Sequence, residues 1–295
     1  MKLQRSRRYK LTIGNYETGD GVLIEDLQVT FDVSKSTNNK NRTNSASIEV
    51  YNLSEANVKL LDTDYPAAVL EAGYLDTTGV RRIFAGQVTH VGTRKSGTDT
   101  ITQITMGSGY TTLNHQLLSE FAPVGTDIKD VFEKIRVAVG ADRGVYNITT
   151  NLNNSIISGY PLSGTPKEML DEITEKFQLD WQLDDGVLYV HDNDRPATEQ
   201  YQLAYVISPF TGLIERPYRV SGDRRRSVKD KAKKPRVQMK ILLNPDINAG
   251  DIIRIEEGLL KGWYKVDTIR HYGGWRSESW YTDIRGSLIE KVDKT

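Results

Sequence analysis

Apolar and polar residues alternate along the first third of the chain with the period of two that is typical of a strand with one buried face. The polar stretch 34–44 interrupts this alternation and is typical of an exposed loop. The pattern predicts strands over residues 27–33, 46–50, 67–74, 83–91 and 100–106. Short strands at this spacing indicate a β-barrel or β-sandwich, which we place over residues 1–115.

The hydrophobic period changes to that of helices in the middle of the chain. Apolar residues form one stripe over 128–139, with Thr126 as the expected cap and Gly140 as the stop. A second helix follows Thr165-Pro166-Lys167-Glu168, which is a capping box with proline at the first helical position. Two helices with this spacing predict a mixed domain over residues 116–198.

A hairpin closes this middle domain. The alternating segments 179–183 and 187–190 flank Asp185-Gly186, which predicts a type I′ turn. We expect Asp184 and Asp185 to be solvated acids, because they lie at a turn. His191-Asp192-Asn193-Asp194 follows, and we interpret it as a hairpin exit whose side chains bond their own backbone rather than as a metal site.

The last third of the chain returns to the period of strands, over 237–243, 252–255, 263–269 and 280–289. Their order and spacing match those of the strands from 46 to 106, although the residues differ. This weak internal repeat predicts a second β module over 199–295 with the plan of the first. Six aromatic residues crowd this module, and we interpret them first as core residues and second as an interface: Trp263, Tyr264, Tyr272, Trp275, Trp280 and Tyr281.

Composition narrows the class of protein. The chain has 295 residues, of which 38% are apolar, and no apolar run approaches the ~18 residues of a membrane-spanning helix. The basic start is followed by no apolar run, so we expect no secretory signal. There is no cysteine, which excludes disulfide scaffolds, cysteine-ligated metals and thiol catalysis.

Charge is balanced overall but concentrated in one place. The stretch 216–240 holds eleven basic and two acidic residues, a net charge of +9 in a chain whose formal charge is zero. Its simplest interpretation is a solvated loop, and its functional interpretation is contact with phosphates or an acidic protein. No aromatic residue interleaves its basic core, which favours an acidic protein over nucleic acid. The candidate contact residues are Arg224, Arg225, Arg226, Lys229, Lys231, Lys233, Lys234 and Arg236.

Signatures of catalysis and of cofactor binding are missing from the sequence. There is no P-loop, dinucleotide fingerprint, nucleophile elbow or zinc-protease motif. The four histidines fall in four separate segments without metal-ligand spacing. We therefore expect a protein that is not an enzyme, with no catalytic residue, no cofactor and no metal.

Three groups of segments resemble the baseplate hub proteins of contractile-tailed bacteriophages. The first is the run 21–33 with 44–54, and the second is 162–166 with its helix and the hairpin 181–190. The third is 211–217 with 242–251. They span nearly the whole chain in the order of that family, from which the basic stretch 219–236 departs.

This resemblance implies a mainly β fold with a smaller α+β part. Two tail-tube-like β-barrels, over 1–115 and 199–295, would flank the mixed helix and hairpin domain 116–198, with a basic insertion at 219–236. It implies a homotrimer whose six barrels continue the hexameric tail tube and seat the central spike protein. Its partners would be the tail tube protein, the spike and, as a further candidate, the tape-measure protein.

The same resemblance implies a protein of the phage virion that is assembled in the host cytoplasm, without a membrane or a specific nucleic acid as partner. A tail-tube initiator or another baseplate adaptor stays open as an alternative. A nucleic-acid-binding protein that uses residues 216–240 is a more distant one.

Overall fold

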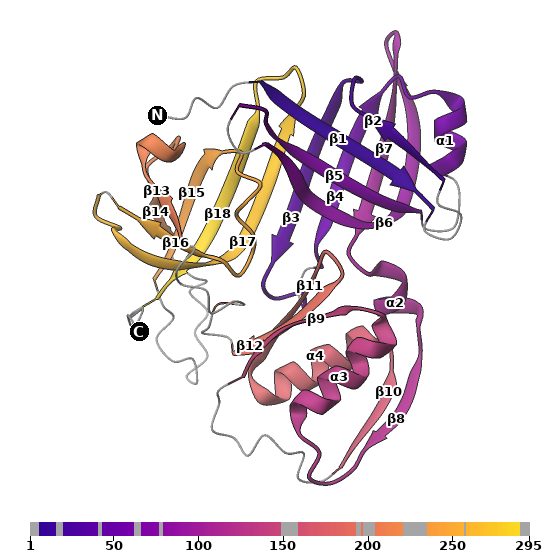
Figure 1. Cartoon of the computed structure of the whole chain (residues 1–295), viewed down its shortest axis with the longest axis vertical. Coiled ribbons are helices and arrows are strands. Elements are labelled where there is room, and N and C mark those ends of the chain that lie inside the picture. The colour runs from indigo at the N-terminus through magenta and orange to yellow at the C-terminus, as the bar shows by residue number, and fades with distance from the viewer. Residues whose placement is uncertain are drawn as a thin grey trace.

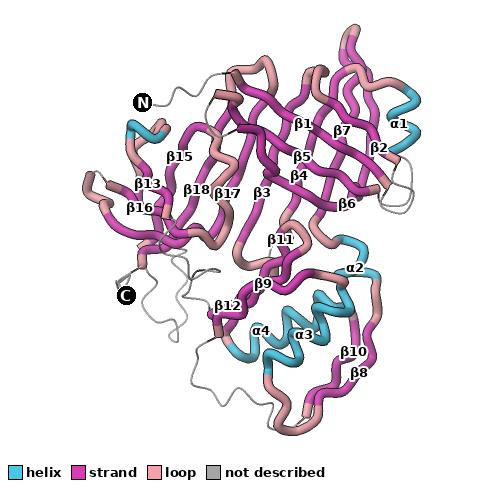
Figure 2. Tube along the Cα trace, in the orientation of Figure 1, coloured by secondary structure: helices cyan, strands magenta, loops and turns pink. Residues whose placement is uncertain are grey.

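Strands make up most of the fold, and thirteen of them join in one mostly antiparallel sheet (Figure 1). The computed structural model describes residues 6–15, 20–40, 43–61, 66–76, 79–148, 159–192, 196, 204–220, 235–256 and 258–289. Figure 2 shows α2, α3 and α4 gathered in a smaller unit below the sheet. Within the described ranges, no helix has both the length and the apolar character needed to cross a membrane.

The first half of the sheet is built largely from the segments that alternate in the sequence. Its strands are β1 (Arg7–Gly14), β2 (Gly21–Ile24), β3 (Val29–Ser36), β4 (Ser45–Tyr51), β5 (Ala67–Tyr74), β6 (Gly79–Ser96) and β7 (Asp99–Gly107). The short helix α1 (Glu55–Leu61) lies between β4 and β5. Alternate side chains of β3 and β4 are buried, as a sheet with one face against a core requires.

The second half of the sheet comes from the last third of the chain. Its strands are β13 (Tyr205–Ile207), β14 (Tyr218–Val220), β15 (Arg236–Leu242), β16 (Ile252–Ile255), β17 (Gly262–Gly274) and β18 (Trp280–Leu288). Strands predicted over 237–243, 252–255, 263–269 and 280–289 therefore form close to their expected places. A single 3-10 turn at Pro209–Thr211 follows β13.

One strand, β17, joins the two halves. Its first residues pair with β16, its residues from Thr268 to Gly274 pair with β3, and its other edge pairs with β18. The sheet therefore runs without a break in the order β14-β15-β18-β17-β3-β4-β7-β6-β5-β1-β2. The expectation of two separate β-barrels is corrected here, because β17 is long enough to serve both halves and no described strand pair closes a barrel.

The middle unit lies below the large sheet in Figure 1 and contains two small sheets and most of the helical residues. Its elements are α2 (Tyr110–His115), β8 (Leu118–Ala122), α3 (Ile128–Val139), β9 (Asp142–Asn147), β10 (Tyr160–Gly164), α4 (Pro166–Phe177), β11 (Leu179–Asp184) and β12 (Val187–Asp192). β8 pairs with β10, and β12 pairs with both β11 and β9. This mixture matches the α+β character predicted for the middle of the chain.

Local signals in the sequence explain where these elements begin and end. The capping box is present, because the Thr165 backbone N–H donates to Glu168 Oε2 at 2.9 Å and the Glu168 N–H donates to Thr165 Oγ1 at 3.3 Å. α3 is capped by Asp127 rather than by the predicted Thr126, whose hydroxyl donates to the Pro123 carbonyl instead. Positive φ angles at Asp185 and Gly186 fit the predicted type I′ turn.

Three clusters of buried side chains form the core, one under each half of the sheet and one in the middle unit. The last third of the chain also contributes to the first cluster through Trp275 and Trp280. Trp280 lies edge-on against Phe31 at 5.1 Å, and Trp275 lies against Tyr9 at 5.6 Å. The interpretation of the late aromatic residues as core is therefore right for these two tryptophans.

We expect Trp280→Ala to lower the free energy of unfolding by about 3–5 kcal/mol, because it leaves a cavity in a core shared by both halves. Trp280 is 0% exposed, whereas Phe210 is 76% exposed and serves as the matched control. Phe210→Ala should change the free energy by no more than about 0.5 kcal/mol. Denaturant titration measures both, and equal effects of the two variants would contradict this assignment.

Candidate functional site

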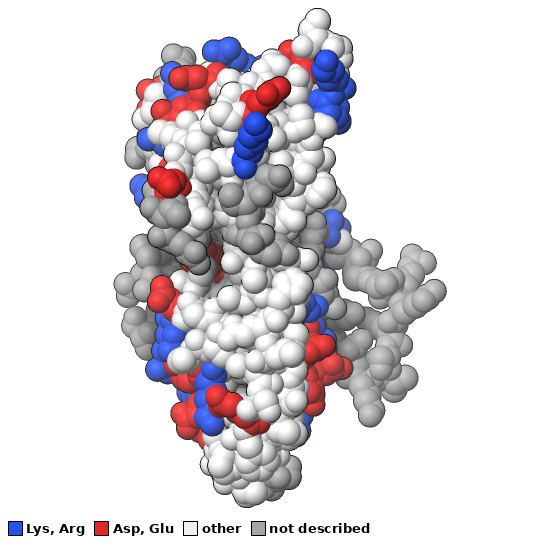
Figure 3. Space-filling model, turned by 90° about the vertical axis from the view of Figure 1, so that its right-hand side faces the viewer, with Lys and Arg blue, Asp and Glu red and all other residues white. Residues whose placement is uncertain are grey.

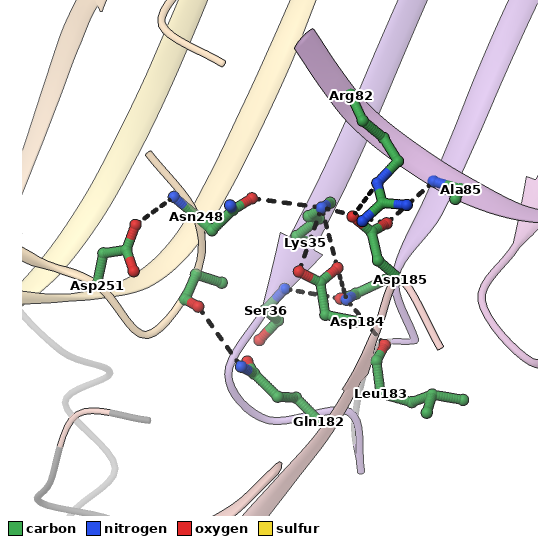
Figure 4. Close-up of polar contacts among 12 residues, drawn as sticks. Lys35, Ser36, Arg82, Ala85, Gln182, Leu183, Asp184, Asp185, Asn248 and Asp251 are labelled. Carbon is green, nitrogen blue, oxygen red and sulfur yellow. Dashed lines mark hydrogen bonds and ion pairs between the residues drawn. The ribbon is translucent and has the colours of Figure 1, made fainter. Parts of the chain in front are cut away.

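A polar junction lies where both halves of the sheet meet the middle unit, and Lys35 is at its centre (Figure 4). Lys35 comes from the end of β3, next to Ile269 of β17. Its side chain is fully buried, and its Nζ lies 2.9 Å from Asp184 Oδ1 and 3.8 Å from Asp185 Oδ1. It also donates to Asn248 Oδ1 at 3.4 Å, so one ammonium group touches three parts of the chain.

The two acids at the β11–β12 turn complete the junction. Arg82 Nε of β6 lies 2.9 Å from Asp185 Oδ2, and the Ala85 backbone N–H donates to Asp185 Oδ1 at 3.1 Å. Asn44 Nδ2 donates to Asp184 Oδ1 at 3.2 Å. The expectation of solvated turn acids is thus wrong, since this turn points into the molecule and its acids neutralise a buried lysine.

The loop between β3 and β4 covers the free edge of β11. The Asn39 N–H donates to the Trp181 carbonyl at 2.9 Å, and Asn44 Nδ2 donates to the Leu183 carbonyl at 3.2 Å. Asn44 also accepts the Ser36 N–H at 2.9 Å, which shapes the loop itself. The stretch 34–44 was expected to be exposed, but several of its residues are buried, and the Asn44 side chain and the Asn39 N–H satisfy carbonyl groups of the middle unit.

Burial raises the pKa of three carboxyl groups around the junction. Desolvation raises the pKa of Asp180 and of Asp251 to about 6, and it raises the pKa of Asp185 against the effect of Lys35. Asn38 Nδ2 donates to Asp180 Oδ1 at 2.5 Å, and the Asn248 N–H donates to Asp251 Oδ2 at 2.7 Å. These acids have amide or cationic partners, so the arrangement is suited to fixing segments in place.

The two buried histidines lie in separate strands and make short-range contacts. His191 Nδ1 lies 3.0 Å from the carbonyl oxygen of Asp192, as the hairpin-exit interpretation predicts. His271 Nδ1 lies 2.8 Å from Thr282 Oγ1. Desolvation lowers the pKa of His191 to about 4 and that of His271 to about 3. Among the residues that the structure describes, no cluster of acids and histidines could hold a metal ion.

The predicted partner-contact residues lie almost wholly outside the described part of the chain. Arg236 is described, and it stands exposed at the start of β15 opposite Ser287. The remaining candidates from Arg224 to Lys234 fall in the range that the structure does not describe. Their role therefore stays a prediction.

Sequence reasoning missed Lys35, although a signal for it was present. Lys35 continues the inward-facing series Val29, Phe31 and Val33 at the same spacing of two. A lysine at a strand position that faces the core requires an acid that neutralises it. The acid sits about 150 residues away in sequence, on a turn that the alternation pattern alone does not orient.

Solved structures with a similar fold include two described as tail proteins. The 43 kDa tail protein of prophage MuSo2 from Shewanella oneidensis superposes with a TM-score of 0.64 at 8% identity, over 96% of this chain and 98% of that one. A tail protein from Neisseria meningitidis MC58 gives a TM-score of 0.63 at 12% identity, over 96% and 97% of the two chains.

A third similar structure comes from a secretion system. The c3393 protein of Escherichia coli, described as a type VI secretion component with structural similarity to the T4 tail proteins gp27 and gp5, gives a TM-score of 0.63 at 8% identity. The match covers 90% of this chain and 74% of that one. At these identities the likeness shows a shared fold, which is that of tail proteins.

The sequence itself identifies the family. The baseplate hub gp41 family model matches residues 10–221, and the chain belongs to this family of structural baseplate proteins of phage tails. The resemblance seen in the sequence is thereby confirmed. No curated protein matches the chain.

We expect Lys35→Met to lower the free energy of unfolding by about 3–5 kcal/mol, because it leaves buried carboxylates without their cation. Lys10→Met is the control, since Lys10 pairs with Glu25 at 3.4 Å on the surface and should change the free energy by less than about 0.5 kcal/mol. Thermal and denaturant unfolding measure both variants. A loss for Lys35→Met as small as that of the control would show that the junction is not a stabilising contact.

We expect Asp251→Asn to stabilise the protein at pH 8 but not at pH 4. The raised pKa of Asp251 means that the folded state favours the protonated acid, so its contribution to stability is lost as the pH rises through about 6. Asparagine stays neutral and can still accept the Asn248 N–H. The advantage over wild type should grow between pH 4 and pH 6 to about 1–3 kcal/mol and then stay constant. A pH-independent difference in unfolding free energy would refute this.

Proposed function

We propose that the chain is the baseplate hub subunit of a contractile tail, in which three copies form a ring between the hexameric tail tube and the central spike. The observation that carries this proposal is the match to the baseplate hub gp41 family over residues 10–221. The likeness of the fold to a secretion protein described as similar to the T4 tail proteins gp27 and gp5 supports a place in a tail-like assembly.

The plan of the sheet supports a ring of three. We propose that the segments 1–115 and 199–295 act as two tail-tube-like modules, with 116–198 as a separate domain beside them. Two such modules in each of three chains make six similar surfaces, which is the number a hexameric tube presents. The main path of the sheet ends at β14 and β2, and a side branch through β16 ends at β13, so each chain has strand edges on which a neighbour can continue the ring.

The basic stretch is proposed as the contact with an acidic protein of the tail. The residues from Arg224 to Arg236 carry most of the local positive charge, and no aromatic side chain among them could stack on bases. The tail tube protein and the tape-measure protein are the candidate partners. In this role the chain needs neither a catalytic residue nor a cofactor, and it acts in the virion after assembly in the host cytoplasm.

Subunit counting tests the proposal. We expect three copies around the tail axis in a reconstruction of the assembled tail made without imposed symmetry, between the last tube ring and the spike. The density around residues 224–236 should belong to an acidic surface of another protein. Six copies in a ring would instead indicate a tail-tube initiator, and a position away from the axis would indicate a peripheral adaptor.

A further inference from the structure

A groove opens at one end of the sheet, between α1 and the tip of the β6–β7 hairpin. Its volume is about 440 Å³. Leu53 and Val58 form an apolar floor, while Lys59, Arg94 and Lys95 place three cations around it. Glu55 is the one acid among the lining residues. The groove thus suits an apolar side chain that has an acid beside it.

The walls of this groove are held by specific hydrogen bonds. Asn52, in the left-handed region with φ 56°, donates through Nδ2 to Asp99 Oδ1 at 3.0 Å and accepts the Thr100 N–H at 2.9 Å. Ser54 Oγ accepts the Asn57 N–H at 3.3 Å at the start of α1. Because both walls are tied to the same corner, the groove is formed before anything binds.

Two of the groove's three cations form no ion pair with the described residues. Arg94 pairs with Glu49 at 3.0 Å. Lys59 and Lys95 form no ion pair with any residue that the structure describes, and both are exposed. The lysines therefore leave a positive rim around an apolar floor. In Figure 3, which looks at the side where Figure 1 draws α1, a group of basic side chains stands at the upper right, with acidic side chains elsewhere on the upper end.

A complementary loop lies at the far side of the molecule, between β16 and β17. Leu259 at its tip is 102% exposed. The turn is anchored, since Gly258 has a φ of 82°, the Tyr264 hydroxyl donates to the Leu260 carbonyl at 2.8 Å, and Leu260 packs against the core of the second half. The structure therefore presents a leucine to solvent on a fixed support.

The charges beside Leu259 match those of the groove. Glu256 precedes the tip and is exposed, and Lys261 follows it and is exposed as well. An acid before the leucine can meet Lys59 or Lys95, and the lysine after it can meet Glu55. The match thus includes an apolar contact and ion pairs of both signs.

The positions of groove and loop exclude a contact within one chain and suit a contact between two. Figure 1 draws α1 at the right-hand edge of the sheet and β16 at its left-hand edge. A contact that joins two different patches of identical chains is head to tail, and such contacts close into rings when the rotation per copy allows it. This is the kind of contact that the proposed hub ring needs.

We propose that the Leu259 loop of one copy seats in the α1 groove of the next copy. The inference rests on the proposed ring and deepens it, because it names the contact between neighbouring subunits. The occupant of the groove is then a second copy of this chain. An acidic segment of a different tail protein is the competing occupant, and the experiment below separates the two.

Cysteine crosslinking tests the contact directly, because the chain has no cysteine of its own. Thr93→Cys, on the groove wall, is mixed with Leu259→Cys from a separate preparation, and oxidation should give a disulfide-linked pair of chains. The matched control replaces Thr93→Cys with Val137→Cys, since Val137 is 65% exposed on α3 in the middle unit. We expect about tenfold more linked dimer with the groove variant, which corresponds to about 1.4 kcal/mol of preference.

Charge reversal checks that the linked pair reports the proposed fit. Adding Lys59→Glu and Lys95→Glu to the groove variant should return the yield to the control level, and Glu256→Lys on the Leu259→Cys chain should restore part of it. Yields that stay high with like charges facing each other would overturn the ion-pair component. Circular dichroism of each variant confirms that it is folded before crosslinking.

The outcomes keep this contact separate from the hub proposal. A crosslink yield at the control level overturns the contact, whatever the number of copies in the tail, and leaves the groove to an acidic segment of another protein. A high yield with a copy number other than three upholds the contact and overturns the trimer. Light scattering on the uncrosslinked chain reports its own association independently of either cysteine.

Discussion

The pairing of β3 with β17 is the constraint on which the other parts depend. β17 uses one edge for both β16 and β3, so a single strand belongs to both halves of the sheet. The same pairing sets Lys35 at the end of β3, where its buried ammonium needs acids. The turn at Asp184 and Asp185 supplies them. The register of two strands therefore decides where the middle unit docks.

A buried ion pair between parts of a protein carries a desolvation cost that can cancel its attraction, so its net stabilisation is small. Its geometry nevertheless restricts how the joined parts are oriented. Replacing such a pair by apolar side chains is often neutral, whereas removing one partner is costly. An ammonium that must reach two carboxylates and an amide tolerates little rotation of the middle unit against the sheet. Arg82 and the Ala85 N–H, both on β6, also bind Asp185 of this turn. The turn is therefore held from β6 as well as from β3. These contacts therefore fix the angle between the middle unit and the sheet.

Sequence patterns predicted the strands with one buried face and the well-capped helices, because their signals are local. β1 was not among the predicted strands, although Tyr9, Leu11 and Ile13 alternate with the basic and polar residues of the basic start. The continuity of the sheet through β17 could not be predicted, because strand partners depend on contacts about 240 residues apart. The burial of the 185–186 turn could not be predicted from the sequence either, because a type I′ turn forms equally well in solvent and against a buried lysine. The one local feature that indicated the junction was the position of Lys35, two residues after the inward-facing Val33.

The ends of the sheet bear on the proposed ring, because they favour side chains over strand pairing as the basis of a contact between copies. An open edge is a template for unwanted growth, and proteins limit it with short edge strands and charges. β14 has three residues, of which Arg219 is exposed, and the exposed Arg216 lies just before it, while β2 has four residues. Strands this short offer few backbone bonds to a neighbour, so they favour no single partner strongly. In the proposed contact, a groove with an apolar floor and a charged rim would give the selectivity that these edges lack, because it would favour a loop of matching shape and charge.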